Sequence, residues 1–211
     1  MDIKLHYDVL NNKRFSIVKE LQTFKNRFYL AGGTGLALQI GHRVSEDFDY
    51  FTIGPFKNDR LDSELHKLFP THTISVIQNE ENTYTCLLND EIKLSFFKLE
   101  YENISPFVDT EYFNIAGILE IGIMKILALP RASYKDYVDL YYIMNKYELG
   151  ELIGAAKKKH KDFNEAIYIK CLLSYEDLEM LPIKFMSGFH IDPNVVFTVI
   201  EKKVKSYLNE I

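Results

Sequence analysis

The chain has 211 residues, 47% of them hydrophobic and 26% charged, so it can bury the core of one ordinary domain or of two small ones. Its net charge of −5 argues against a basic surface over the whole chain, although a local patch for nucleic acid stays open. No segment resembles a signal peptide or approaches the roughly 20 apolar residues of a membrane helix. We therefore expect a cytoplasmic protein that does not bind membranes.

Cysteine and histidine spacing gives no metal signature. Cys86 and Cys171 are far apart and match no zinc or redox pattern, so we expect reduced core residues. The six histidines include no HxH or HxxxH arrangement, which argues against a zinc site. The sequence also lacks GxSxG and Walker lysine motifs, which argues against a hydrolase or a P-loop enzyme.

The first half of the chain mixes predicted helices and strands. Residues 14–27 favour a helix with one apolar stripe, formed by Phe15, Val18, Leu21 and Phe24. A short buried strand, FYLA, then ends at Gly32-Gly33. We expect Thr34 to cap a short helix that stops near Gly41.

Further along, DFDYFT (47–52) alternates with period two and predicts a strand. Residues 57–68 favour a helix. Three strand-like runs follow, and their short polar connections suit an antiparallel meander; the runs are HTISVIQN, NTYTCLLN and EIKLSFFKL.

The second half of the chain is predicted to be helical. Residues 118–129 are apolar nearly all round, as expected of a buried helix, and Pro130 interrupts them. Residues 133–147 resume a helical pattern, and the rest is mostly helical. We predict an α+β fold: a mixed α/β domain over residues 1–110 with a small mixed sheet, and a helical domain over residues 111–211.

The stretch from Gly32 to Asp49 combines a turn and paired carboxylates. Glycines at a strand-to-helix turn uncover N–H groups at a positively polarised helix start, which is an anion site to which Thr34 can add a hydroxyl. Asp47 and Asp49 share a strand face, and two adjacent carboxylates repel unless a cation lies between them. Taken alone, the turn and the carboxylate pair each have an ordinary structural explanation. Together, they predict a site for a nucleoside triphosphate with Mg²⁺ or Mn²⁺.

Two residues between the glycine turn and the carboxylate pair have alternative interpretations. His42 suits a structural hydrogen bond better than a role as a base. Arg43 either pairs with Asp47 or Glu46, or reaches a phosphate.

A second charged group lies in the helical half. Lys125 interrupts an apolar helix, where an unpaired ammonium is costly, so it must find a carboxylate or face a cleft. Asp136 and Asp139 lie three apart, on one helical face. One interpretation is a buried ion pair that joins two helices. Another basic cluster, residues 155–161, is either a solvated face or an RNA phosphate contact.

The first motif resembles a known family. Its glycine turn and carboxylates follow the nucleotidyltransferase superfamily that includes DNA polymerase beta, and AGGTGLALQIGHRVSEDFDYFT is similar to the AbiEii/AbiGii-type toxin nucleotidyltransferases. The matching positions are Gly32, Gly33, Thr34, Leu36, Leu38, Gly41, His42, Arg43, Ser45, Asp47, Asp49 and Phe51. A second block in residues 124–144 resembles the family's downstream motif, at Lys125, Arg131, Lys135, Asp136 and Asp139.

The resemblance implies a transferase that moves a nucleoside monophosphate from a nucleoside triphosphate, such as ATP or GTP, to tRNA, another RNA or a protein. It implies a toxin with a cognate antitoxin, metal bound by Asp47 and Asp49, phosphates bound by Gly32, Gly33, Thr34 and Arg43, and a triphosphate contact by Lys125 with Asp136 orienting it. Many relatives in the superfamily carry a third carboxylate, but Ser95 stands at the expected place. The alternative is a non-catalytic nucleotide-binding module that acts through a protein partner.

Overall fold

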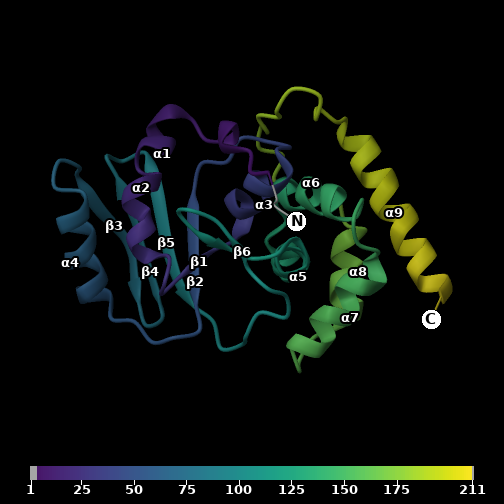
Figure 1. Ribbon diagram of the computed structural model, residues 1–211. Coiled ribbons are helices and arrows are strands. Elements are labelled where there is room, and N and C mark those ends of the chain that lie inside the picture. Colours follow the sequence, from purple (N-terminus) through teal and green to yellow (C-terminus); the bar gives the residue numbers. More distant parts are fainter. Residues whose placement is uncertain (1–3, 211) are drawn as a thin grey trace. The chain divides into compact units, whose positions relative to one another are not determined.

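The computed structural model describes residues 4–210 and divides the chain into two compact units, one ending at Gly117 and the other beginning at Ile118 (Figure 1). The boundary predicted from the sequence, 110/111, falls between the short strands β6 (Val108–Asp109) and β7 (Asn114–Ile115). These strands pair with each other, so the sheet of the first unit continues past that boundary.

A seven-stranded mixed sheet forms the centre of the first unit, in the order β3-β4-β5-β2-β1-β7-β6. The remaining strands are β1 (Tyr29–Leu30), β2 (Phe48–Thr52), β3 (Ile74–Glu80), β4 (Thr83–Leu88) and β5 (Ile92–Lys98). Strands β3, β4 and β5 form the predicted antiparallel meander. β2 lies parallel to β5 and antiparallel to β1, which places the motif strand in the middle of the sheet.

The helix predicted over residues 14–27 is broken. It consists of α1 (Asn12–Ser16), α2 (Val18–Leu21) and a 3-10 turn, η2 (Gln22–Phe24), and a further 3-10 turn, η1 (Tyr7–Val9), precedes it. Three members of the predicted apolar stripe are buried, but Phe15 is 45% exposed. The chain bends between α1 and α2, so the first side chain of the stripe, Phe15, does not pack in the core.

The two faces of the sheet differ. On one face Tyr50 of β2 stacks on Phe96 of β5 at 5.2 Å between ring centroids, and Phe24 and Phe28 pack edge-on against Phe96. Helix α4 (Asn58–Leu68) buries Leu61 and Leu65. Because side chains alternate along a strand, Asp49 projects from the other face. The Tyr50–Phe96 cluster therefore packs on one face, and the charged motif lies on the other, where Phe51 stacks on Tyr29 and Phe97.

The second unit is helical, as predicted. Its elements are α5 (Ile118–Ala128), η3 (Leu129–Arg131), α6 (Tyr134–Ile143), α7 (Leu149–Lys159), α8 (Glu165–Leu172) and α9 (Pro193–Glu210). Pro130 lies in the 3-10 turn that ends α5. Gly122 allows close packing, since a Cβ there would lie 2.8 Å from Leu152 and 3.1 Å from Ile143. The predicted α+β fold class is confirmed.

The cysteines only partly follow the prediction. Both are free thiols, but Cys86 is buried in β4 whereas Cys171, at the end of α8, is partly exposed and is not a core residue. Among the helices of residues 4–210, none has the length and apolar character to cross a membrane.

Candidate functional site

The glycine turn begins helix α3 (Gly32–Ile40). Gly32 has a φ of +61°, and a Cβ there would lie 2.6 Å from Oδ2 of Asp49, so both conformation and space favour glycine. Gly41, with a φ of +75°, ends the helix as predicted. The turn therefore brings the first residue of the helix directly against the second carboxylate of the motif.

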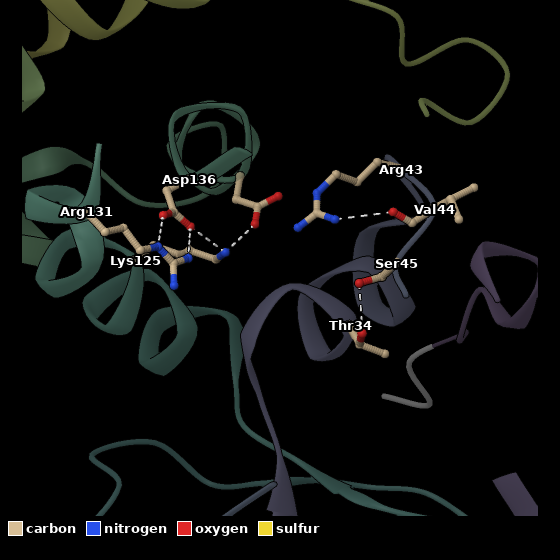
Figure 2. Close-up of polar contacts among 8 residues, drawn as sticks. Thr34, Arg43, Val44, Ser45, Lys125, Arg131 and Asp136 are labelled. Carbon is tan, nitrogen blue, oxygen red and sulfur yellow. Dashed lines mark hydrogen bonds and ion pairs between the residues drawn. The ribbon is translucent and has the colours of Figure 1, made fainter. Parts of the chain in front are cut away.

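Thr34 does not cap the helix, contrary to the prediction. The N-cap is Ala31, and Thr34 is the third residue of α3. Its buried hydroxyl lies 2.7 Å from Ser45 Oγ (Figure 2). It donates to the backbone carbonyl of Asp47. Thr34 thus fixes the loop that carries the first aspartate, because the helix start and the approach to β2 lie side by side.

Arg43 lies beside the helix start. A Cβ added at Gly33 would overlap with the Arg43 guanidinium and would lie 3.5 Å from Ser45 Oγ. The Arg43 side chain is buried, and its Nη1 donates to the carbonyl of Val44 at 3.2 Å (Figure 2). The first N–H groups of a helix have no intrahelical acceptor, so this turn combines a fixed cation with N–H donors. Such a combination suits the binding of an anion.

The two aspartates lie where the sequence places them, on the face opposite the aromatic core. Asp47 comes just before β2 and Asp49 lies within it. The Asp47 side chain is 48% exposed and accepts a contact from Lys93 Nζ of β5 at 3.4 Å. The sequence reading did not select Lys93. The sequence does indicate it, because side chains alternate along β5 and Lys93 therefore lies on the same face as Ser95.

Ser95 lies directly beside Asp49. The parallel register of β2 and β5 pairs the two residues, so the position at which the family resemblance predicts a third carboxylate adjoins Asp49. Its hydroxyl is buried and has no hydrogen-bond partner in the described part of the chain. Within residues 4–210 there is also no cluster of three or more His, Cys, Asp or Glu residues that could hold a metal.

Two accessible carboxylates still fit a divalent metal. Mg²⁺ is commonly bound through one or two carboxylates together with substrate phosphates and water, rather than by a cage of protein ligands alone. Asp49 lies within β2 beside the turn at Gly32, and Asp47 directly precedes that strand. The donor set therefore suits a metal that arrives with a polyphosphate.

The charged group of the second unit forms a compact cluster. Lys125 of α5 lies 2.8 Å from Asp136 and 2.5 Å from Asp139, and both carboxylates of α6 are fully buried. Arg131 donates to both oxygens of Asp136 at 2.6 Å (Figure 2). The Lys125 side chain is only 6% exposed, whereas that of Arg131 is 59% exposed. Two cations thus balance two anions, and this geometry matches the buried ion pair considered from the sequence.

Two of the four lysines in the basic cluster at residues 155–161 form ion pairs within their own unit. Lys157 pairs with Glu165, and Lys159 pairs with the buried Glu120 of α5. Burial lowers the pKa of Lys159 to about 8. These contacts favour a structural role for the two lysines over an RNA phosphate contact.

Sequence comparison identifies the family. Residues 17–210 match the family described as nucleotidyl transferase AbiEii toxin, type IV toxin–antitoxin system. The chain belongs to this family. The resemblance carried by the two motifs is confirmed, and membership places the chain among nucleotidyltransferase toxins, for which a nucleoside triphosphate substrate and an antitoxin partner are implied.

Similar proteins match nearly the whole length of the chain in sequence or in fold. An uncharacterized protein of Aquifex aeolicus (strain VF5) is 36% identical over 191 residues, which cover 87% of this chain and 89% of that protein. The fold is similar to that of JHP933 from Helicobacter pylori, with a TM-score of 0.56, 18% identity and coverage of 98% and 97% of the two chains. A second H. pylori protein, a candidate nucleotidyltransferase, gives a TM-score of 0.53 at 19% identity, with coverage of 92% and 94%.

Proposed function

We propose that the protein transfers a nucleoside monophosphate from a nucleoside triphosphate to an RNA acceptor, tRNA in particular. The observation that carries this proposal is the contact between the two halves of the motif. Gly32 lies against the Asp49 carboxylate and Gly33 lies against the Arg43 guanidinium. A turn suited to an anion would therefore adjoin a carboxylate suited to a metal within one unit.

Each motif residue receives a role from its contacts. Asp47 and Asp49 would hold Mg²⁺ or Mn²⁺, which when bound supplies positive charge to the phosphate oxygens. Arg43 and the first N–H groups of α3 would bind phosphate, with the guanidinium already fixed beside the turn. Thr34 would act by holding the carbonyl of Asp47, and thus as a positioning residue rather than a phosphate ligand.

The transfer step follows from these positions. The acceptor oxygen forms a bond to the α-phosphorus, while the bond to pyrophosphate breaks and pyrophosphate leaves with the electron pair. Ser95 is no base at neutral pH, so the proton of the acceptor hydroxyl passes to Asp49 or to water. The residues contribute chiefly by positioning and by electrostatic stabilisation.

Lys125 stays a predicted triphosphate ligand only on the strength of the resemblance. To reach a phosphate it would have to leave Asp136 and Asp139, two carboxylates that are themselves fully buried. Breaking such pairs is costly. We therefore infer that Lys125 and Asp136 stabilise the helical unit, and that Arg131, held by Asp136, presents the accessible charge.

The alternative function is a nucleotide-binding module that performs no transfer. It is favoured by Ser95, which puts a neutral, unpartnered hydroxyl beside Asp49 where a third carboxylate would serve metal binding and proton transfer. In that case the bound nucleotide would control association with a protein partner.

The decisive experiment measures transfer of label from each of the four nucleoside triphosphates to total tRNA and to protein acceptors, with Mg²⁺. We expect Asp49→Asn to lower transfer at least about 1000-fold, because a charged metal ligand becomes neutral. The matched control is Asp59→Asn, at an exposed position of α4, which leaves transfer unchanged. Calorimetry separates the alternatives: metal–nucleotide binding without transfer supports the binding module, and absence of both binding and transfer contradicts both functions.

A further inference from the structure

A cavity of about 370 Å³ lies in the first unit, at the beginning of β1. Its lining comes from the residues before and within β1, the end of β2, the segment before β6, and β7. Phe28, Tyr29 and Phe107 supply aromatic walls. The cavity is distinct from the glycine turn, which follows the other end of β1. Its size and aromatic lining suit a small planar ligand.

Several polar atoms at this cavity have no partner. The Tyr29 hydroxyl, both amide atoms of Asn103 and the Ser105 hydroxyl are buried and form no hydrogen bond within the described residues. Burial raises the pKa of Tyr29, and a polar contact with the Asn103 side chain opposes that rise in part. Tyr29 stays a neutral donor. Unsatisfied buried polar groups are rare, and groups gathered around one cavity indicate a ligand that pairs with them.

The charges around the cavity argue against a phosphate or another anion as that ligand. Lys25 pairs with Asp109 at 2.7 Å and also donates to the carbonyl of Thr110, while Arg27 pairs with Glu64. Glu102 adds a negative charge to the rim. The ligand that fits is therefore neutral, flat and polar at its edge.

We propose that this cavity binds an unstacked nucleobase. The Phe107 ring, 44% exposed and 4.9 Å from the Tyr29 ring, offers a face on which a base can stack. Within the described residues the Asn103 amide forms no hydrogen bond of normal length, so it offers a donor and an acceptor, the combination that pairs with a base edge through two hydrogen bonds. Proteins that recognise single-stranded RNA commonly combine aromatic stacking with such edge contacts.

The position of the cavity links it to the proposed reaction, so this inference rests on the proposed function for its biological meaning. Tyr29 pairs with Phe51, and the two rings stack at 5.9 Å. Phe51 lies two residues after Asp49 on the same face of β2, which corresponds to roughly 7 Å along the strand. A base held in the cavity would therefore lie along the sheet face that carries the carboxylates, as a base of the acceptor RNA.

The test measures binding alone, so it does not depend on transfer. Fluorescence anisotropy with a labelled single-stranded RNA hexamer, in EDTA and without nucleoside triphosphate, gives the dissociation constant of the whole protein. We expect Phe107→Ala to weaken binding by about 5- to 100-fold through lost stacking. Asn103→Ala is expected to weaken it at least about 5-fold. The latter removes no hydrogen bond of normal length among residues 4–210, so folding should be retained.

Phe15→Ala is the matched control, because Phe15 is 45% exposed, contacts one tyrosine ring, Tyr7, and does not line the cavity. Unchanged binding in this control, together with losses in both cavity variants, supports the proposal. Equal binding in all variants, equal losses in all three, or no binding by the wild type overturns it. If free nucleoside monophosphates compete with the RNA at equal concentration, the cavity binds a base, but the ligand is a free nucleotide. That result would overturn the assignment to an acceptor RNA.

Discussion

The two motif regions of this protein use charge in different ways. In the first unit, Asp47 and Lys93 have side chains that are 48% and 39% exposed and lie 3.4 Å apart. In the second unit, Asp136 and Asp139 are fully buried and contact Lys125 at 2.8 and 2.5 Å. Exposed pairs contribute little to stability, whereas a buried charge must be compensated. The first region thus leaves Asp47 and Lys93 accessible to a ligand, and the second uses its charges to join helices.

The largest effect that separates these regions is expected from Lys125→Met. The substitution leaves two buried carboxylates with one cation fewer, so it should lower the free energy of unfolding by about 3–5 kcal/mol. Urea denaturation followed by circular dichroism measures this change. If Lys125 is instead a triphosphate ligand, the same variant would keep its stability and lose nucleotide affinity.

Lys135→Met is the control for that experiment. Lys135 lies on α6 beside Asp136 but, unlike Lys125, forms no ion pair among the residues that the structure describes. We expect its stability to change by no more than about 0.5 kcal/mol, as for most surface substitutions. A decrease in the free energy of unfolding as large as that of Lys125→Met would show that removing any positive charge near α6 destabilises the unit.

A smaller effect, on nucleotide binding rather than on stability, is expected from Gly33→Ala. The new methyl group would displace the Arg43 guanidinium from the helix start, which should weaken nucleotide binding by about 1.5–3 kcal/mol, the contribution of a charge-assisted hydrogen bond. Stability should change by only about 1 kcal/mol, because alanine suits a helix better than glycine. Calorimetric titration with nucleotide and Mg²⁺, beside urea denaturation, measures both quantities.

Gly154→Ala supplies the comparison for Gly33→Ala. Gly154 lies in α7 with open space around its Cβ position, so this variant should gain about 0.5–1 kcal/mol of stability and keep nucleotide binding. Equal nucleotide affinity in both glycine variants would remove Arg43 from the proposed phosphate site.

Local sequence patterns were sufficient for the main elements. Alternating side chains identified β2 and the β3–β5 meander, and helical periodicity together with Gly41 and Pro130 marked helix ends. These features depend on neighbours in sequence, so one chain reveals them. The two-residue strands β6 and β7 carry too little pattern to be seen, which placed the predicted domain boundary between them.

Contacts between distant segments were harder to predict. Thr34 had the chemistry of a cap, but Ser45 and the Asp47 carbonyl lie beside it only once α3 and β2 are packed. Lys93 faces Asp47 because β2 and β5 are parallel neighbours, a pairing that no short segment specifies. Lys125 was open to two interpretations until both carboxylates of α6 had positions.

The smallest effect is expected from Ser95→Ala, which tests the position where the resemblance predicts a third carboxylate. Because the buried Ser95 hydroxyl has no hydrogen-bond partner within residues 4–210, Ser95→Ala should be neutral or should add up to about 1 kcal/mol of stability. Transfer should stay within about twofold of the wild type, since the proposed site uses only Asp47 and Asp49 as carboxylates. Thr85→Ala, at the residue that pairs with Ser95 from β4, controls for changes in packing on this face. A large loss of transfer in Ser95→Ala alone, with stability unchanged, would mean that the Ser95 hydroxyl takes part in the chemistry beside Asp49.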